Sequence, residues 1–485
     1  MVEEKYKVRG YYPTIGIECH VQFKTVTKLF AAVGNDAREA APNTLVSHIC
    51  FGLPGALPVL NEKAVEYGIR AAFALGIDPQ AFSKFDRKHY FYPDLPMGYQ
   101  ITQYDQPIIV GGRVDAVVDG KVQTFPLTRA HIEADAGKST HPVGADYSLV
   151  DLNRAGTPLL EIVSEPCMHT AAEAKAYAHE LYVLMKYADV SDANLYYGNM
   201  RFDVNVSVSK NPDQFGTRTE TKNLNSFRSI ERAVEYEINR QIDALEAGET
   251  IVQETRGWDD DAQKTFSQRT KEDAHDYRYF PDPDIPPVVL DPDFVASIKK
   301  TMPVMPSELR TRFIAAGLDV SQVETIIDEP LMGKLLLAIC DANGDAVAKI
   351  AGNWIGGTLQ KAVADGHETW QQVFDARDGL VELAKMVEAG DLSSSAAKDI
   401  LLEVITTNGD PRAIAGQKNL LQVSDTNELA AIVQRVLEEN PKAADDVKRG
   451  EMKAIGFLVG QVMKASQGKA NPGVVQSIIK TQLGV

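Results

Sequence analysis

The sequence of 485 residues has few cysteines and no long hydrophobic run. Its cysteines lie far apart, at Cys19, Cys50, Cys167 and Cys340, and this spacing suits a reducing compartment better than a disulfide framework. No apolar stretch approaches the ~18 residues that cross a bilayer, and the opening residues, MVEEKYKVRGYY, lack the apolar core of a signal peptide. We therefore predict a cytoplasmic protein without a membrane partner.

Positive charge and nucleotide-binding motifs are also scarce. The net charge of -17 disfavours a nucleic-acid partner, because phosphate binding usually requires a basic surface. Residues 440–485 are an exception, with seven Lys or Arg against three Asp or Glu. This excess permits local RNA contact, although a solvated helical face explains it equally well. No Walker A loop, GxGxxG fingerprint or G-x-S-x-G elbow is present, so motifs give no sign of ATP use.

The first 292 residues mix alternating strands with a few helices. TIGIECHVQF and RFDVNVSVS each place apolar side chains on one face and polar side chains on the other. RVDAVVDGKVQTFPL predicts a hairpin that turns at Asp119-Gly120. A capping box of Thr170 and Glu173 predicts one helix, and an apolar stripe between Ser226 and Gly248 predicts another. These patterns favour an α+β domain built on an antiparallel sheet.

The remaining sequence has helical periodicity. The proline-rich run FPDPDIPPVVLDPDF closes the first domain, because proline continues neither a strand ladder nor a helix. Ser321 and Glu324 predict a further capping box, and the turn Asn408-Gly409-Asp410-Pro411 predicts a hinge. We expect three domains, with two all-α domains after the sheet domain: residues 1–292, 293–410 and 411–485.

Three predicted strands carry possible metal or proton ligands on their polar faces. These residues are Glu18 with His20, His131 with Glu133 and Asp135, and Asp203 with Asn205. Residues two apart on a strand lie ~7 Å from each other on the same face, which suits a cation held between neighbouring strands. Carboxylate oxygens are the ligands that Mg²⁺ prefers. The alternative is an ordinary wet face of an antiparallel sheet, which also carries such residues.

An irregular segment, FDRKHYFYPDLPMGYQITQYD, interleaves aromatic, proline and cationic residues. Such interleaving stacks bases and holds phosphates in nucleic-acid-binding proteins. Packing of an aromatic loop under the edge of a domain is the competing interpretation, and NLYYGNMRF and HDYRYFPDPD allow the same two interpretations.

Several long runs, in this order, resemble the B subunit of the tRNA-dependent amidotransferase that makes Gln-tRNA(Gln) or Asn-tRNA(Asn). The matching runs are GIECHVQ, FGLPGALPVLN, FDRKHYFYPDLPMGYQITQYDQPI, AHIEADAGKS, DLNRAGTPLLEIVSEP, TETKNLNSFRSIERA, HDYRYFPDPDIPP and RGEMKAIGFLVGQVMKASQGKANP. They span nearly the whole chain, and several exceed eight residues.

This resemblance implies a cradle-shaped catalytic domain, an all-α helical domain and an all-α tail like the small YqeY protein. It implies an ATP-dependent ligase that binds misacylated Glu-tRNA(Gln) or Asp-tRNA(Asn), phosphorylates the side-chain carboxylate with ATP and Mg²⁺, and amidates it with ammonia. The implied partners are an amidase, or A, subunit, which releases the ammonia, a small C subunit, and the misacylated tRNA. A second divalent cation is also compatible with the motifs.

The matching motifs also imply roles for single residues. Glu18, His20, Glu133 and Glu220 are expected to bind the metal and act in catalysis. Asp203 and Asn205 are candidates for a second cation.

Three residues of TETKNLNSF, namely Lys222, Asn223 and Asn225, suit ATP phosphates or the acceptor end of the tRNA by their chemistry. Arg87, Lys88 and Tyr92 are expected along the path of ammonia, where a sealed passage protects an acyl phosphate from water.

The sequence departs from the family pattern in three places. SHIC, residues 47–50, stands where many members have CPVC, which argues against a zinc site there. Ala134 replaces one of a pair of acidic residues, so that coordination is expected to fall on Glu133 with Asp135 behind it. Met97 stands where a lysine is frequent.

Two other functions fit parts of the sequence. The first is that of a tRNA-positioning subunit whose partner performs all the chemistry, and the second is that of a stand-alone metal-dependent hydrolase or ligase for small molecules. The clustered ligand residues argue against the first function, because a positioning surface does not need them.

Overall fold

The computed structural model describes residues 2–270, 276–422, 426–451, 453–466 and 470–485. These residues form two compact units, 1–306 and 307–485. The prediction of three domains bounded at residues 292 and 410 stays a prediction. Helix α4 (Pro292–Lys300) packs against α1 (Glu62–Ala74), and α12 (Pro411–Gln417) packs against α10 (Arg377–Glu388) and α11 (Ser394–Thr407).

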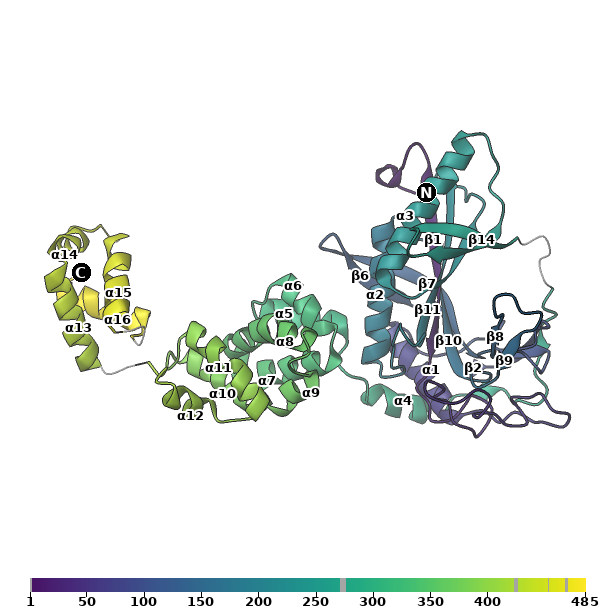
Figure 1. Cartoon of the computed structure of the whole chain (residues 1–485), viewed down its shortest axis with the longest axis horizontal. Coiled ribbons are helices and arrows are strands. Elements are labelled where there is room, and N and C mark those ends of the chain that lie inside the picture. Colours follow the sequence, from purple (N-terminus) through teal and green to yellow (C-terminus); the bar gives the residue numbers. More distant parts are fainter. Residues whose placement is uncertain (1, 271–275, 423–425, 452, 467–469) are drawn as a thin grey trace. The chain divides into compact units, whose positions relative to one another are not determined.

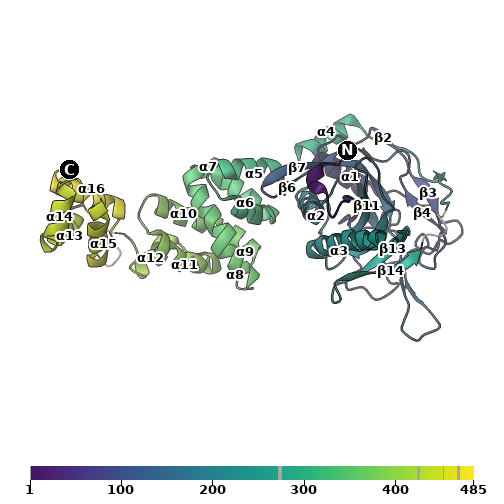
Figure 2. The same cartoon turned by 90° about the horizontal axis from the view of Figure 1, so that it is seen from above.

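The first unit is built on one large sheet, as Figures 1 and 2 show. Its strand order is β14-β13-β12-β11-β1-β10-β7-β4-β3-β15, with β5 and β6 also paired to β7. The central strands are β1 (Tyr12–Gln22), β7 (Lys121–Ala134), β10 (Pro158–Ser164), β11 (Met200–Ser209) and β12 (Thr219–Leu224). The outer strands are β3 (Asp86–His89), β4 (Tyr99–Thr102), β5 (Ile109–Val110), β6 (Arg113–Val118), β13 (Glu254–Asp259), β14 (Lys264–Thr270) and β15 (Phe280–Pro281).

The predicted α+β fold with an antiparallel sheet is confirmed, with one exception. Strands β12 and β13 pair in parallel, because α3 (Phe227–Glu246) connects them and returns the chain to the same end of the sheet. Two small sheets complete the unit. They consist of β2 (Phe82–Ser83) with β16 (Val288–Val289), and β8 (Lys138–Thr140) with β9 (Leu149–Asp151).

The alternation predicted along β1 is present in the structure. Ile15, Ile17, Cys19 and Val21 are buried in the main core, whereas Glu18, His20 and Gln22 are part-exposed on the other face. Helices α2 (Ala171–Tyr187) and α3 pack against each other and contribute to this core (Figure 1). The helices therefore cover the apolar face, and the polar face is left for the site.

The helix and turn signals in this unit are confirmed. Thr170 and Glu173 form the predicted capping box of α2, and Ser226 caps α3. The hairpin of β6 and β7 turns at Asp119-Gly120, where both residues have positive φ angles of 49° and 74°, as a type I′ turn requires. The proline-rich run was predicted to close the first domain. It contains the two-residue strands β15 and β16 and the first residues of α4, because proline is tolerated at a sheet edge and in the first turn of a helix.

The second unit is helical in its described residues. Its helices are α5 (Pro306–Ala315), which starts at the boundary, α6 (Val320–Ile327), α7 (Pro330–Asn353), a π-helical turn (Trp354–Leu359), α8 (Gln360–Ala364), α9 (Trp370–Asp375), α10, α11, α12, α13 (Thr426–Glu439), α14 (Pro441–Lys448), α15 (Lys453–Ala465) and α16 (Pro472–Leu483). The last four share a core of their own around Leu429, Leu458 and Ile479. None of the described helices combines the length and the apolar character needed to cross a membrane.

One helix signal in this unit was wrong. Asp319, not Ser321, caps α6, and its side chain accepts the backbone N–H of Ser321. Glu324 instead forms an ion pair with Arg310, at 2.8 Å. Asn408 ends α11 in the left-handed conformation (φ 50°), so the helix breaks where a hinge was predicted. Its movement as a hinge stays a prediction.

Candidate active site

The polar face of the central sheet collects charged residues from strands that are distant in sequence. The pairing places His20 of β1 between Glu161 of β10 and Arg201 of β11, and places Glu161 opposite His131 of β7. Four strands therefore contribute one row of ionisable side chains.

The centre of this row is a cluster of two histidines and two glutamates. Nε2 of His20 lies 3.7 Å from Oε1 of Glu133 and 3.6 Å from Oε2 of Glu161. Nε2 of His131 lies 3.5 Å from Oε2 of Glu133 and 3.3 Å from Oε2 of Glu161. The structure thus brings two of the predicted ligands, His20 and Glu133, into one cluster. His131, which the alternation of its strand had marked as a possible ligand, and Glu161, to which the sequence had assigned no role, complete it.

The histidines supply the positive charge that this cluster needs. Burial lowers the pKa of His20, but the hydrogen bond and negative charge of Glu161, together with Glu133, outweigh it and raise the pKa to about 9. The same balance of burial and neighbouring carboxylates raises the pKa of His131 to about 9. Burial also opposes the charged form of Glu161, but both histidines hold its pKa well below the usual value.

A second group of charges lies beside this cluster. Nζ of Lys222 on β12 is 2.9 Å from Oδ2 of Asp203 and 3.0 Å from Oε1 of Glu220. Glu18 lies opposite Asp203 in the pairing of β1 with β11, and its Oε1 accepts a hydrogen bond of 3.2 Å from Asn205. Burial raises the pKa of Glu18, and so do the negative charges of Glu161, Glu220 and Asp203.

A cavity of about 250 Å³ joins the two groups. The charged side chains along its wall are His20, Lys88, Glu133, Asp135, Glu161, Arg201, Asp203 and Lys222. We call it the charged cavity. It concentrates charges of both signs around a small volume, which is typical of a site for polar, charged reactants.

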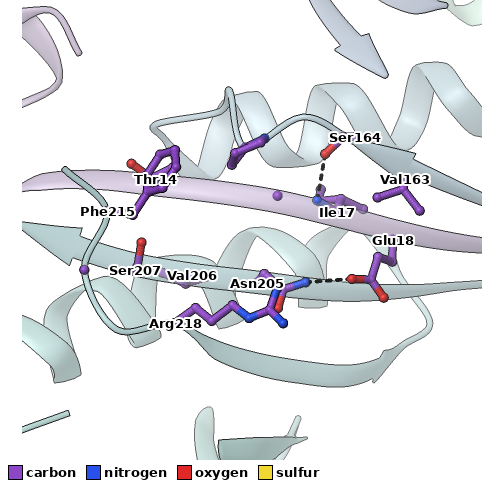
Figure 3. A pocket seen from close by; sticks show the side chains of 13 residues that line it. Thr14, Ile17, Glu18, Val163, Ser164, Asn205, Val206, Ser207, Phe215 and Arg218 are labelled. Atoms are coloured by element: carbon purple, nitrogen blue, oxygen red, sulfur yellow. Dashed lines mark hydrogen bonds between the residues drawn. The ribbon is translucent and has the colours of Figure 1, made fainter. Parts of the chain in front are cut away.

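A larger cavity of about 320 Å³ lies along the same strands, β1, β10 and β11, and Figure 3 shows the residues that line it. Glu18 and Asn205 stand at the end nearer to the charged cavity, Val163 and Phe215 provide apolar surface, and the strand at Ile17 forms part of the wall. The remaining lining residues are Thr14, Gly16, Ser164, Pro166, Val206, Ser207, Gly216 and Arg218. We call this the side cavity. Its mixed wall suits a flat, partly apolar ligand that also carries negative charge.

Of the three residues predicted along the path of ammonia, one lines the charged cavity and two do not. Lys88 lines the charged cavity, whereas Arg87, its neighbour on β3, forms ion pairs with Asp282 and Asp284 at 2.8 and 2.9 Å. Tyr92 lines neither cavity and is 45% exposed.

Two residues of the TETKNLNSF run lie outside the part of the site that is described. Asn225 is exposed after the end of β12 and lines neither cavity. The side chain of Asn223 is not among those that the structure describes. Of the predicted ATP-contacting residues, Lys222 lines the charged cavity.

The central cluster fits a divalent cation by its donor atoms. One ligand atom each from His20, Glu133 and Glu161 lies within 4.8 Å of the others, and two of the three side chains offer carboxylate oxygens, which hard cations prefer. Two adjacent carboxylates repel each other unless positive charge lies between them. Protonated histidines provide that charge in the metal-free protein, and a cation provides it when bound.

Cys50 of the SHIC segment contacts the buried side chain of Lys28. Nζ of Lys28 is 3.4 Å from Sγ of Cys50 and donates a 2.7 Å hydrogen bond to the carbonyl oxygen of Leu45. Burial lowers the pKa of Lys28. Within the described residues, these contacts favour a structural role for the segment.

Two family models match the chain. The model of the GatB/GatE catalytic domain matches residues 13–296, and the model of the GatB domain matches residues 335–483. The chain belongs to the GatB/GatE family. The resemblance drawn from its motifs is thereby confirmed, and the charged cavity lies within the catalytic-domain match.

Curated members of the GatB/GatE family match almost the whole chain. The B subunit of the aspartyl/glutamyl-tRNA(Asn/Gln) amidotransferase of Caldanaerobacter subterraneus is 44% identical, with 98% of this chain and 99% of the relative covered. The protein of the same name from Carboxydothermus hydrogenoformans is 41% identical with the same coverage. The B subunit of the chloroplastic/mitochondrial glutamyl-tRNA(Gln) amidotransferase of Sorghum bicolor is 43% identical, with 98% and 88% covered.

Proposed function

We propose that this chain is the B subunit of a tRNA-dependent amidotransferase and that it activates the side-chain carboxylate of Glu-tRNA(Gln) or Asp-tRNA(Asn) with ATP. Its membership of the GatB/GatE family and the names of its relatives support the reaction class. The observation that carries the assignment of this step to the present chain is the cluster of His20, Glu133 and Glu161 beside two cavities on one sheet face. A protein that only positions tRNA would have no use for it.

The reaction has two steps. A carboxylate oxygen of the aminoacyl side chain attacks the γ-phosphorus of ATP, the bond to the bridging oxygen breaks, and ADP leaves. Ammonia then attacks the acyl carbon, inorganic phosphate leaves, and the amide remains. A free carboxylate is a poor electrophile, so that the first step creates the leaving group required by the second.

We assign the nucleotide to the side cavity and its phosphates to the boundary with the charged cavity. The side cavity offers apolar surface from Phe215 and Val163 and the positive charge of Arg218. Lys222 lies just beyond the boundary and is positioned by Asp203 and Glu220, where a cation would neutralise charge on the transferred phosphoryl group.

His20, Glu133 and Glu161 would hold Mg²⁺, with Glu18, Asp203, Asn205 and Glu220 as the neighbouring candidates for a second cation. The metal would supply charge neutralisation to the ATP phosphates. The chain's own part is to fix the donor side chains on adjacent strands, so that little reorganisation is needed when the reactants bind.

The remaining assignments concern partners. We propose that the amidase partner, the A subunit, supplies ammonia, that the small C subunit is the third member of the complex, and that ammonia passes Lys88 on its way to the charged cavity. Arg87 and Tyr92 belong to this path only as predictions. We also propose that the four-helix core of α13–α16 contributes to tRNA binding.

The assay for this function is ATP consumption by the assembled complex that depends on Glu-tRNA(Gln). His20→Ala and Glu18→Ala should each reduce this ATP consumption about 100-fold, which is the upper end of the loss that follows from disturbing a metal site. Arg113→Ala is the matched control, because Arg113 pairs with Asp115 on the exposed β6–β7 hairpin. Unchanged ATP consumption in both site variants would instead favour a tRNA-positioning role. Activity on small molecules without the amidase partner would favour a stand-alone enzyme.

A further inference from the structure

Arg201 is a cation of the charged cavity that the motifs did not assign to any role. It lies on β11 directly opposite His20 and lines the cavity wall. Within the described chain, Asp135 is the hydrogen-bond partner of its guanidinium group: Nη2 donates to Oδ2 of Asp135 at 3.0 Å. A guanidinium group has five N–H donors in a planar fork, so most of them are left for a ligand in the cavity.

Asp135, which also lines the charged cavity, helps to fix the position of this guanidinium group. Oδ2 of Asp135 also lies 3.1 Å from Nε of Arg154. The same Arg154 donates a 2.9 Å hydrogen bond from Nη2 to the carbonyl oxygen of Gly137. Asp135 is therefore held by Arg154, which is itself held by the backbone at Gly137, and Asp135 acts as a positioning residue that orients Arg201.

The two lysines of the cavity are already engaged, and His20 faces Glu133 and Glu161. Lys222 forms ion pairs with Asp203 and Glu220, and Nζ of Lys88 lies over the ring of Tyr277, 4.9 Å from its centre. The rest of the wall includes Glu133 and Glu161, which repel an anionic reactant. Arg201 is thus the side chain best placed to attract one.

The order of residues along β11 indicates which of the two anionic reactants, ATP or the aminoacyl carboxylate, lies near Arg201. Asn205 lines the side cavity, Asp203 stands at the boundary, and Arg201 lies two residues further along β11. Four residues of a strand span about 13 Å. In the proposed placement, a nucleotide in the side cavity would direct its phosphates toward Asp203 and Lys222. Arg201 lies beyond them, on the side where the acceptor of the phosphoryl group must enter.

We infer that Arg201 binds the side-chain carboxylate of the aminoacyl group on the tRNA and presents it to the γ-phosphate. This inference rests on the proposed function and adds the residue that recognises the acid. A planar guanidinium group matches both oxygens of a carboxylate. The amide product offers one oxygen and no negative charge, so that the same contact also separates substrate from product.

The test compares the assembled wild-type complex with Arg201→Ala, Arg201→Lys and Asp135→Asn, with Arg113→Ala as the control. Thermal unfolding of each complex checks its folding. We expect Arg201→Ala to lower kcat/KM for Glu-tRNA(Gln) about 10- to 100-fold, the effect of a lost charge-assisted hydrogen bond. The KM for ATP should stay unchanged. Added guanidinium ion should restore part of the activity of Arg201→Ala, and Arg201→Lys should be intermediate.

Binding measurements provide a readout that a merely structural role would not change. The wild-type complex should bind Glu-tRNA(Gln) more tightly than Gln-tRNA(Gln), and Arg201→Ala and Asp135→Asn should remove this preference. Retention of the preference and of kcat/KM in Arg201→Ala would overturn the inference. A change in the KM for ATP alone would also overturn it, because Arg201 would then contact the phosphates. A wild-type complex without tRNA-dependent ATP consumption would instead remove the proposed function itself.

Discussion

At the scale of single residues, the polar face places like charges close together and separates them with cations. Glu133 and Glu161 approach the same two imidazole rings. Each contact favours the charged form of both partners, which outweighs the cost of burial. A neutral side chain at either glutamate position would leave the imidazolium groups with half of their compensating charge.

Glu161→Gln tests this balance directly. We expect tRNA-dependent ATP consumption to fall about 10- to 100-fold, which is the range of losses caused by disturbing the surroundings of a metal ligand. Weaker Mn²⁺ binding, measured by electron paramagnetic resonance, should accompany it. Glu165→Gln is the control, because Glu165 follows β10 and hydrogen-bonds Thr128 outside both cavities. Normal Mn²⁺ affinity in Glu161→Gln would contradict the assignment of this ligand.

Gly216→Ala tests the wall of the side cavity. A Cβ atom at Gly216 would lie 2.1 Å from the carbonyl oxygen of Val208, so the loop that carries Phe215 must move. We expect kcat/KM for ATP to fall roughly 10- to 100-fold, because small displacements of binding groups are costly, while affinity for tRNA is kept. Gln214→Ala, an exposed change in the same loop, should behave like the wild type. Impaired tRNA affinity with a normal KM for ATP would place the nucleotide elsewhere.

The sequence predicted part of this residue-level detail. His20 and Glu133 follow from alternation along their own strands. Glu161 and Arg201 have the same signal, since each is a charged residue on a strand with buried neighbours. Alternation along one strand does not show which strands pair with each other. The pairing of β1 with β10 brings Glu161 to His20.

At the scale of secondary structure, α3 is attached to the sheet by a buried polar network. The side chain of Glu237 is fully buried and contacts Arg240, with further hydrogen bonds from Thr219 at 2.6 Å and Thr265 at 3.0 Å. Gln241, one turn later, donates to the carbonyl oxygen of Val206 on β11 at 3.0 Å. This network connects the helix to β11, β12 and β14.

Glu237→Gln should therefore destabilise the fold. Loss of the charge leaves part-buried Arg240 without its ion-pair partner and removes one of the two carboxylates that pair with buried Arg256, a change that costs about 3–5 kcal/mol. Glu235→Gln, on the exposed side of the same helix, should cost far less. Equal free energies of unfolding in urea at pH 7 for the two variants would contradict the role of the network.

The pH dependence of this network has a definite sign. Burial opposes ionisation of Glu237, but Arg240 and the hydroxyl and amide donors outweigh it and lower its pKa below 4.5. A lowered folded-state pKa stabilises the fold above the unfolded value, and this stabilisation is lost as pH falls through the folded-state pKa. The stability difference between the wild type and Glu237→Gln should therefore shrink below about pH 4.5.

Local sequence signals predicted elements well where the turn or cap is short-range. The Asp119-Gly120 turn and the Thr170 cap each depend on residues a few positions apart. Asp319 and Ser321 are both good caps, and spacing to Glu324 favoured the wrong one. Glu324 instead forms an ion pair with Arg310 of α5. Residue spacing within one helix cannot predict such a contact between two helices.

At the scale of the whole chain, the sheet unit and the helical unit have separate cores. Pro411, Ile414 and Ala415 of α12 are buried, and the helix packs on α10 and α11. The four helices after it have their own apolar cluster. Helix α11 thus ends at the turn of residues 408–411, but α12 after the turn still packs against the helices before it.

Two truncations separate tRNA binding from stability. Removal of residues 426–485 should weaken affinity for tRNA and leave the rest of the chain folded. Removal of residues 411–485 should weaken it equally and also destabilise the helices around α11, because it deletes the buried side chains of α12. Thermal unfolding and a filter-binding assay for tRNA distinguish these effects. Undiminished tRNA affinity in both truncations would exclude a binding role for the C-terminal helices.

The most direct measurement of the central claim follows the γ-phosphate itself. The assembled complex is mixed with γ-labelled ATP and Glu-tRNA(Gln) in the absence of an ammonia source, and label on the aminoacyl-tRNA is counted after rapid quenching. We predict labelled tRNA with the wild-type chain and none above background with His20→Ala. Full transfer of label by the His20→Ala complex would contradict the claim that this sheet face activates the carboxylate.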